Sequence, residues 1–130
     1  MKLLLDTHIL LWYITADPKL PVNFRVAIQD VANEVYLSTV SVWETVIKHT
    51  LCKLTLLGPP AEYLPRQRLA HGIAPLPIDE GAMTHLAGLP LLHRDPFDRI
   101  QVAQTLQHGL TMMTVDADVL AYPVALFPMV

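Results

Sequence analysis

Short hydrophobic runs alternate with longer segments of mixed polarity along the 130-residue chain. The runs at residues 3–5, 34–38, 72–76 and 110–115 predict strands, and residues 124–127 are a candidate for a fifth. The segments 9–15, 22–31, 41–51, 61–70, 79–89 and 97–107 predict helices. Short apolar strands that alternate with helices are typical of an α/β domain with a mostly parallel sheet.

Composition narrows the class of protein. Hydrophobic residues make up 52% of the chain and charged residues 16%, which predicts a single globular domain over residues 1–130. The formal net charge of −3 argues against nucleic-acid binding through a broad basic face. It does not exclude a nuclease, because metal-binding carboxylates make the sum more negative and the bound cations reverse the local field.

Cysteine content and hydrophobic run length predict the cellular location. The only cysteine, Cys52, rules out an internal disulfide, fits a reducing compartment and is expected to be a small buried residue. The apolar runs near both ends are shorter than the roughly 18 residues of a membrane span. We therefore expect a soluble, cytoplasmic protein without membrane contact.

Four acids occupy positions that a parallel sheet would bring to one edge. Asp6 and Asp116 directly follow predicted strands, Glu44 lies one turn into the helix after the strand 34–38, and Asp98 opens the helix that leads into the strand 110–115. Ligands of open parallel sheets bind at the carboxyl ends of the strands. The pattern therefore predicts that the four carboxylates converge.

Each acid also has an ordinary explanation at a helix terminus. Asp6 and Asp116 can cap the helices that follow them, and Glu44 fits a capping box with Ser41. Asp98 is the third residue of a helix that Asp95 can cap. Taken singly, these acids do not establish a site.

Taken together, the four acids predict a metal site. Carboxylates that converge repel one another unless a cation neutralises them, and oxygen ligands favour Mg²⁺ or Mn²⁺ over Zn²⁺. The sequence lacks the cysteine pairs and the histidine helix typical of zinc sites. Divalent ions held in this way suit phosphodiester hydrolysis.

Three segments resemble motifs of the PIN domain, with most likeness to the toxin nucleases of VapBC-type toxin–antitoxin pairs. They are Leu5-Asp6-Thr7-His8-Ile9-Leu10-Leu11-Trp12, Ser38-Thr39-Val40-Ser41-Val42-Trp43-Glu44 and His93-Arg94-Asp95-Pro96-Phe97-Asp98-Arg99. The resemblance implies an α/β/α sandwich, Mg²⁺- or Mn²⁺-dependent RNA cleavage, a homodimer and inhibition by a cognate antitoxin.

The resemblance also implies site residues. Asp6, Glu44 and Asp98 match the first three acids of the family, and Asp116 in Thr114-Val115-Asp116 matches the fourth. A basic residue often fills the middle of that last motif, whereas this chain has Val115. Asp118 is therefore kept as a second candidate for the fourth acid.

Four further residues are candidates for contacts to the substrate, namely Thr7, Lys48, Arg94 and Arg99. Each has an alternative: Thr7 can cap a helix, Lys48 can pair with Glu44 four residues earlier, and at least one arginine is expected to form a surface salt bridge. His8 and His93 are expected to support the acids rather than bind metal. The aromatic residues Trp12, Tyr13 and Trp43 are expected to pack in the core rather than stack on bases.

Three functions from different classes can be compared with this sequence. The leading hypothesis is a toxin endoribonuclease, and the second is a PIN-like module that binds RNA or protein without cutting. A phospho-acceptor domain of receiver type is disfavoured because no lysine follows Lys53. The apolar helix over 9–15 offers a surface for an antitoxin segment or a second subunit.

Overall fold

Three consecutive leucines form the centre of the sheet. Leu3, Leu4 and Leu5 of strand β1 (Lys2–Leu5) have no exposed surface in the computed structural model, which describes residues 1–129. Leu3 and Leu5 pack into the hydrophobic cluster on one face of the sheet and Leu4 into the cluster on the other. Successive side chains of a strand point to opposite faces, so a strand buried on both sides needs a continuous apolar run.

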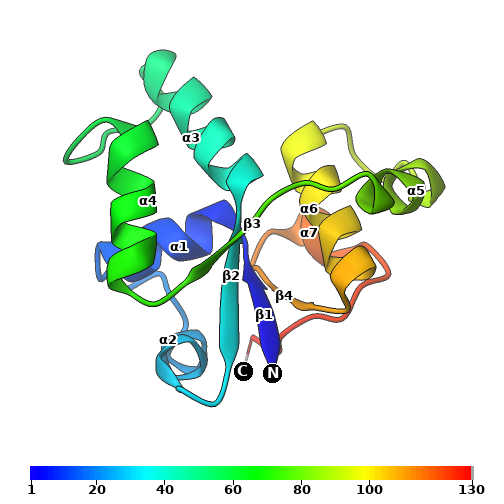
Figure 1. Cartoon of the computed structure of the whole chain (residues 1–130), viewed down its shortest axis with the longest axis horizontal. Helices are drawn as coiled ribbons and strands as arrows, with labels where there is room; N and C mark the ends of the chain where they lie inside the picture. The colour runs from blue at the N-terminus through cyan, green and yellow to red at the C-terminus, as the bar shows by residue number, and fades with distance from the viewer. Residues whose placement is uncertain (130) are drawn as a thin grey trace.

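The sheet is parallel and has four strands. Strand β1 pairs with β2 (Glu34–Ser38) and β4 (Thr111–Met113), and β2 pairs with β3 (Ala74–Leu76), which gives the order β3-β2-β1-β4. The carboxyl ends of β1 and β2 point upward in Figure 1. Strand β3 carries Pro75 and lies at an edge of the sheet, the position at which a strand tolerates proline.

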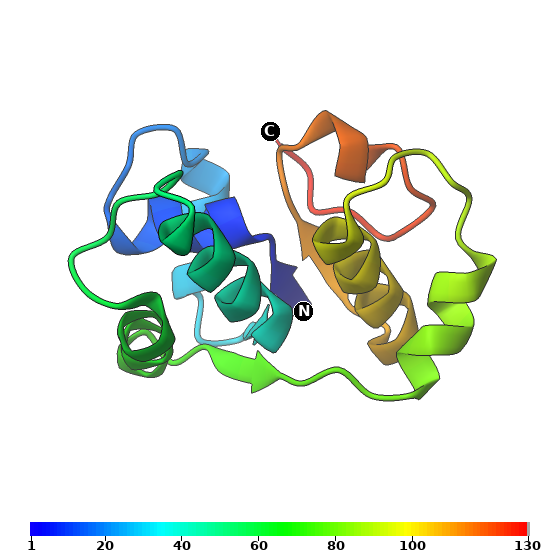
Figure 2. The same ribbon diagram turned by 90° about the horizontal axis from the view of Figure 1, so that it is seen from above.

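Helices cover both faces of the sheet, which confirms the predicted α/β/α architecture. Figure 2 shows one group of helices on each side: α1 (Thr7–Ile14), α2 (Val22–Gln29), α3 (Thr39–Thr50) and α4 (Pro60–Ala70) on one, and α5 (Gly81–Gly88), α6 (Pro96–His108) and α7 (Ala117–Leu120) on the other. The starts of α1, α3 and α6 lie toward the carboxyl end of the sheet in Figure 1.

Two helix ends follow the sequence signals closely. The Asp95 carboxylate accepts hydrogen bonds from the backbone nitrogens of Phe97 and Asp98, so Asp95 is the predicted cap of α6. Gly109 ends α6 in the left-handed conformation, at φ 61°. Glycine adopts this conformation without steric cost, which explains its place there.

Three details differ from the sequence predictions. Helix α3 begins two residues earlier than expected, because the Ser38 hydroxyl rather than that of Ser41 accepts from the backbone at its start. Residues 124–127 form a single parallel bridge, between Met112 and Leu126, rather than a strand. Cys52 is exposed, because it lies in the turn after α3 and not in the core.

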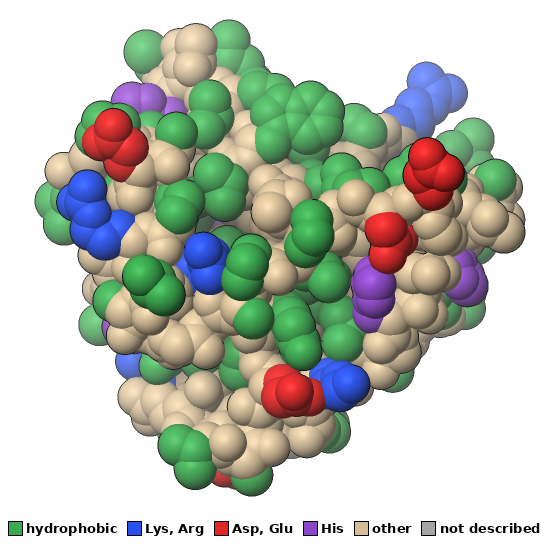
Figure 3. All heavy atoms as spheres, in the orientation of Figure 1, with side chains coloured by type: hydrophobic (Ala, Val, Ile, Leu, Met, Phe, Trp, Pro, Cys, Tyr) green, Lys and Arg blue, Asp and Glu red, His purple; other side chains and the backbone are tan. Residues whose placement is uncertain are grey.

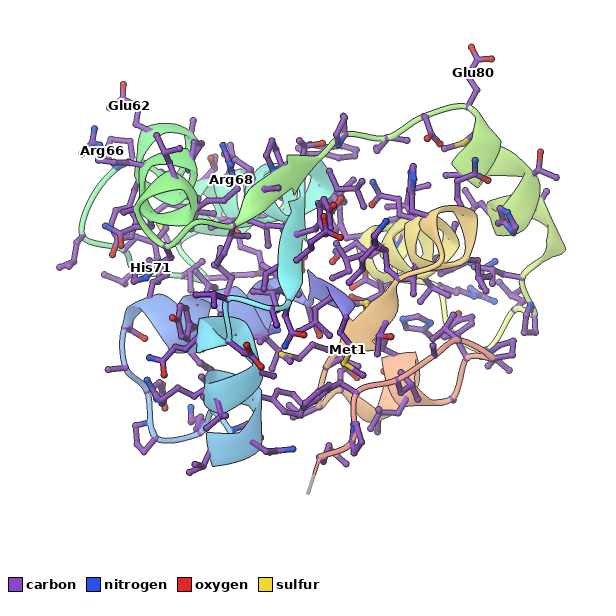
Figure 4. All side chains as sticks on the ribbon, turned by 60° about the horizontal axis from the view of Figure 1, so that its bottom comes forward. Met1, Glu62, Arg66, Arg68, His71 and Glu80 are labelled. Carbon is purple, nitrogen blue, oxygen red and sulfur yellow. The ribbon has the colours of Figure 1, made fainter. Side chains whose placement is uncertain are left out.

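Figure 3 shows one face of residues 1–129. Lys and Arg side chains are scattered among hydrophobic ones there and form no broad basic region. Figure 4 shows Glu62 and Arg66 pointing away from α4, and Glu80 pointing away from the start of α5. None of the helices within residues 1–129 is long and apolar enough to cross a membrane.

A buried polar seam joins α6 to β2, β3 and α3. The Ser38 hydroxyl donates to Gln104 Oε1 at 2.6 Å, and Gln104 Nε2 donates to the carbonyls of Leu76 and Pro77 at 3.3 Å. Ser41 and Gln101 lie beside them, with Ser41 Oγ 3.4 Å from Gln101 Oε1. Buried polar groups are costly unless paired, so this seam fixes α6 against the rest of the domain.

Replacing Ser38 with Ala tests this seam. The change removes the cap of α3 and leaves the buried Gln104 oxygen without its donor, so we expect the free energy of unfolding in urea to fall by about 2–4 kcal/mol. Thr39→Ala, at the exposed neighbouring position, is the control and is expected to change it by no more than about 0.5 kcal/mol. Equal losses in the two variants would contradict the role of the seam.

Candidate active site

Asp6 comes from the carboxyl end of β1 and is 4% exposed. It occupies the residue before α1, but its side chain forms no capping hydrogen bond. Its Oδ2 instead accepts from Thr114 Oγ1 at 2.7 Å, across the β1–β4 pair. The capping explanation is therefore wrong for this side chain. Thr114 is buried as well.

Glu44 lies in α3 and is 3% exposed. Thr7 Oγ1 lies 2.8 Å from both Glu44 Oε1 and Ser41 Oγ. Since a hydroxyl has one proton, Thr7 donates to the carboxylate, and Ser41 is left to donate to Thr7. Glu44 Oε2 accepts from Lys48 Nζ at 2.6 Å. Glu44 is thus held by side chains and caps nothing, because α3 is capped by Ser38.

Asp98 lies in the first turn of α6 and is half-buried. Its Oδ2 lies 3.0 Å from His93 Nε2, and His93 Nδ1 lies 2.7 Å from Tyr122 Oη. His93 therefore supports an acid, as the sequence led us to expect.

Asp116 fulfils the capping alternative with one of its oxygens. Its Oδ1 accepts from the backbone nitrogen of Asp118 at 2.9 Å at the start of α7. Asp116 also lines a hollow of about 220 Å³ together with Asp6, His8, Trp12 and Val115. Asp118 is exposed and does not line this hollow, so of these two candidates only Asp116 lies beside Asp6 there.

The acids lie close enough to affect one another's ionisation. Burial raises the pKa of Asp6, the Thr114 hydrogen bond partly offsets this, and the charges of Glu44 and Asp116 raise it further. Burial likewise raises the pKa of Asp98 to about 6, against a partial offset from His93, and the charges of Asp6 and Glu44 add to the rise. The sheet has therefore brought mutually repelling carboxylates together at one end.

The side chains of the four acids do not converge on a single point in this structure. Within residues 1–129, no three His, Cys, Asp or Glu side chains are arranged to hold a metal ion. The other carboxyl oxygens of Asp6 and Asp98 form no hydrogen bond to the described residues, and no buried side-chain oxygen or nitrogen among them lacks a partner. These two oxygens are therefore open to solvent and available to a ligand.

The basic candidates occupy different surroundings. Lys48 pairs with Glu44, which confirms the pairing that its spacing suggested. Partial burial opposes the Lys48 charge, but the hydrogen bond and negative charge of Glu44 outweigh it and raise the pKa of Lys48. The Arg99 guanidinium donates to Tyr122 Oη and to the Pro90 carbonyl, both at 2.9 Å. Arg94 is exposed.

The sequence did not identify two partners of the acids. Thr114 has a recognisable position, since it is a hydroxyl residue two places before Asp116 at a strand end. Tyr122 has no such signal, because its link to Asp98 depends on contacts between distant segments of the chain.

The three aromatic residues expected in the core have different surroundings. Trp12 and Tyr13 pack against the core, whereas Trp43 is 57% exposed and packs edge-to-face on Phe97. The prediction that Trp43 is a core residue is therefore wrong.

Sequence comparison gives one family match and one curated relative. Residues 3–124 match the sequence model of the PIN domain. A segment of 61 residues is 38% identical to Ribonuclease VapC16 of Mycobacterium tuberculosis, and it spans 47% of this chain and 43% of that protein. The aligned segment is therefore less than half of the relative's length.

Solved structures with the same fold come from several bacteria. VapBC2 from Rickettsia felis, bound to a DNA fragment from its promoter, has a TM-score of 0.69 at 14% identity, with 98% of each chain covered. DNA-bound VapBC from Salmonella typhimurium has a TM-score of 0.69 at 15% identity, covering 100% of this chain and 99% of that one. FitAcB from Neisseria gonorrhoeae has a TM-score of 0.61 at 24% identity, with 98% and 97% covered.

The structural similarity agrees with the match to the family model, which runs through nearly the whole chain. The chain therefore belongs to the PIN domain family.

Proposed function

We propose that this chain is a Mg²⁺- or Mn²⁺-dependent endoribonuclease of the VapC type, the toxin of a type II toxin–antitoxin pair. The observation that supports this most strongly is the group of buried carboxylates at the carboxyl end of the sheet. The charge of Glu44 raises the pKa of both Asp6 and Asp98 there, and the charge of Asp116 raises that of Asp6. The similarity to a VapC ribonuclease over part of the chain supports the same activity.

The chemistry of the donor set fits a hard divalent cation. Asp6, Glu44, Asp98 and Asp116 offer carboxylate oxygens only, the ligands that Mg²⁺ and Mn²⁺ prefer. The raised pKa of Asp6 and Asp98 shows that their negative charges are costly in the folded protein. A cation would remove this cost. We propose these four acids as the ligands.

Such an ion activates a water molecule and neutralises charge on the scissile phosphate. The chain's own residues prepare the site for it. Thr114 fixes one oxygen of Asp6, and Thr7 fixes one oxygen of Glu44, so each acid has a defined orientation. Lys48 neutralises part of the charge of Glu44 and is also a candidate for contact to an RNA phosphate, as is the exposed Arg94.

Replacing single acids tests the assignment. We expect Asp6→Asn, Asp98→Asn and Asp116→Asn to lower Mg²⁺-dependent RNA cleavage roughly 100-fold or more, because a ligand that stabilises the transition state by several kcal/mol is lost. Growth arrest on expression is expected to disappear in parallel. Asn also caps helices, so the Asp116 variant keeps its fold.

Asp118→Asn is the matched control, because Asp118 is an exposed acid in the same segment. It is expected to cleave at the wild-type rate. Full activity of the Asp6 or Asp98 variant would contradict the site, and loss of activity in Asp118→Asn but not in Asp116→Asn would reverse the choice of the fourth acid.

The stability of the metal-free protein gives an independent prediction. The pKa of Asp98 is about 6 in the folded protein against 3.8 for an ordinary aspartate, so the folded state binds more protons between these values. Stability therefore decreases as pH rises from about 4 through 6. At pH 7.5 in EDTA, we expect Asp98→Asn to unfold with a free energy about 1 kcal/mol higher than wild type, after allowance for solvent screening.

This gain is expected to vanish at pH 3.5, where Asp98 is protonated in wild type. Added Mg²⁺ is expected to stabilise wild type and not the variant, since binding to the folded state alone raises stability. Urea unfolding with and without Mg²⁺ measures both effects. A variant less stable than wild type at pH 7.5 in EDTA would contradict a net cost of the Asp98 charge in the folded protein.

A PIN-like module that binds RNA or protein without cutting it is the second candidate. The observation that favours it is the absence, within residues 1–129, of three acids arranged to hold one ion. Calorimetric titration of Mg²⁺ separates the two candidates. A ribonuclease binds the ion at the acids, and a silent module shows no heat that depends on Asp6 or Asp98.

We propose a cognate antitoxin and a second copy of this chain as partners. Support for the antitoxin comes from the VapBC and FitAcB structures that share the fold. A hollow of about 480 Å³ lies beside the apolar helix α1, and it is lined by Ile14, Thr15, Thr55, Leu56, Leu57 and Tyr63. Leu57 is 92% exposed there, which suits an apolar segment of a partner.

Leu57→Asp tests this contact. We expect the cognate antitoxin, when co-expressed, to relieve growth arrest by wild type and not by the variant, because a charge in the hollow opposes apolar contact. RNA cleavage by the purified variant is expected to be unchanged. Leu69→Asp, at an exposed leucine of α4 that does not line this hollow, is the control. Equal relief of wild type and Leu57→Asp would place the antitoxin elsewhere.

A further inference from the structure

The acid Asp98 is connected to a line of hydrogen-bonded side chains that leads away from the other acids. His93 precedes α6, Tyr122 follows α7, and Arg99 lies in the first turn of α6. The distances are 3.0 Å from Asp98 Oδ2 to His93 Nε2, 2.7 Å from His93 Nδ1 to Tyr122 Oη, and 2.9 Å from Tyr122 Oη to Arg99 NH1. Tyr122 is buried, so its hydroxyl depends on these partners.

The direction of the hydrogen bonds follows from the chemistry of the groups. A guanidinium only donates, so Tyr122 Oη accepts from Arg99. The proton of this buried hydroxyl has no acceptor within residues 1–129 other than His93 Nδ1, so Tyr122 donates it there. A neutral imidazole that accepts at Nδ1 carries its proton on Nε2 and donates it to Asp98. Arg99, Tyr122 and His93 therefore all donate toward Asp98. The same guanidinium lies over the Tyr122 ring, 5.8 Å from its centre, which adds a cation–π contact to the hydrogen bond.

This arrangement leaves one Asp98 oxygen for the site. Because His93 occupies Oδ2, the oxygen that remains for a ligand is Oδ1. Without His93 the carboxylate would rotate about its two side-chain torsions, and the site would bear the entropy of fixing it when a cation binds.

We propose that His93, oriented by Tyr122 and Arg99, positions the Asp98 carboxylate for the divalent cation. This inference rests on the proposed function, since it assigns Asp98 as a ligand. His93 is a positioning residue and not a ligand, because both of its ring nitrogens are occupied. Arg99 then acts through Tyr122 within the fold, instead of contacting RNA as its place in the motif suggested.

Tyr122→Phe removes one hydroxyl and keeps the buried ring. We expect it to weaken Mg²⁺ binding, measured by calorimetry, about 10- to 100-fold, which is the usual effect of losing a group that orients a ligand. The rate constant kcat for RNA cleavage is expected to fall with it at saturating RNA and subsaturating Mg²⁺, and KM for RNA to stay unchanged. Tyr36→Phe is the control, because Tyr36 packs against the same hydrophobic cluster as Tyr122 and its hydroxyl forms no hydrogen bond within residues 1–129.

Two replacements of His93 separate positioning from bulk structure. His93→Leu removes the donor to Asp98 and is expected to weaken Mg²⁺ binding as much as Tyr122→Phe or more. His93→Gln keeps an N–H donor at similar reach and is expected to recover part of the affinity. If Gln and Leu bind Mg²⁺ equally weakly, or if all these variants bind it as tightly as wild type, the positioning role is wrong.

A metal-free measurement examines the hydrogen-bond line itself. Nitrogen chemical shifts of ¹⁵N-labelled protein in EDTA are expected to show His93 protonated at Nε2 in wild type, and a mixture of tautomers in Tyr122→Phe. A proton on Nδ1 in wild type would overturn the inference whatever the metal does. If wild type binds no Mg²⁺, the proposed function fails and the inference with it. If wild type binds Mg²⁺ and cleaves RNA but the variants match it, only the inference fails.

Discussion

The cost of burying negative charge, increased by repulsion between neighbouring carboxylates, is the constraint on which the rest of this domain depends. A parallel sheet directs the ends of its strands to one edge, and the buried acids Asp6 and Glu44 lie there together with the half-buried Asp98 and with Asp116. Ionised acids in such surroundings destabilise the fold unless donors or cations compensate. The chain supplies side-chain donors to the first three of these acids: Thr114 to Asp6, Thr7 and Lys48 to Glu44, and His93 to Asp98.

Two of these donors come from parts of the chain distant from their acids, whereas Lys48 and His93 lie four and five residues from theirs. The bond from Thr114 to Asp6 joins segments 108 residues apart, and that from Thr7 to Glu44 joins segments 37 residues apart. The site is therefore assembled by the tertiary structure. The polar seam of Ser38 and Gln104 serves the same end, because it fixes α6, and with it Asp98, against the strand that leads into α3.

The sequence predicted the positions of the acids well because strand ends are local features. The apolar run of β1 ends at Asp6, and β2 occupies Glu34–Ser38 as its hydrophobic pattern indicated. The start of α3 was misplaced since Ser38 and Ser41 are both acceptable caps, and only the end of β2 selects the first. The metal role of the acids, the homodimer and the RNA substrate remain predictions.

Features that depend on distant partners were less accessible from sequence. Trp43 was expected in the core, but the helix face that α3 buries is set by α1, α4 and α6, and Trp43 lies outside it. Cys52 was expected to be buried for its chemistry alone, whereas the turn after α3 exposes it. The link from Tyr122 to Asp98 crosses from one loop to another, and no spacing in the sequence indicates it.

The central claim is that these acids hold a divalent cation. Crystals grown with Mn²⁺ and measured at its absorption edge would test it most directly. The account predicts an anomalous peak from a Mn²⁺ ion that is coordinated by carboxylate oxygens of Asp6 and Asp98, with Glu44 and Asp116 beside it. A map with no peak at these acids, from crystals that hold Mn²⁺ elsewhere or not at all, would contradict the account.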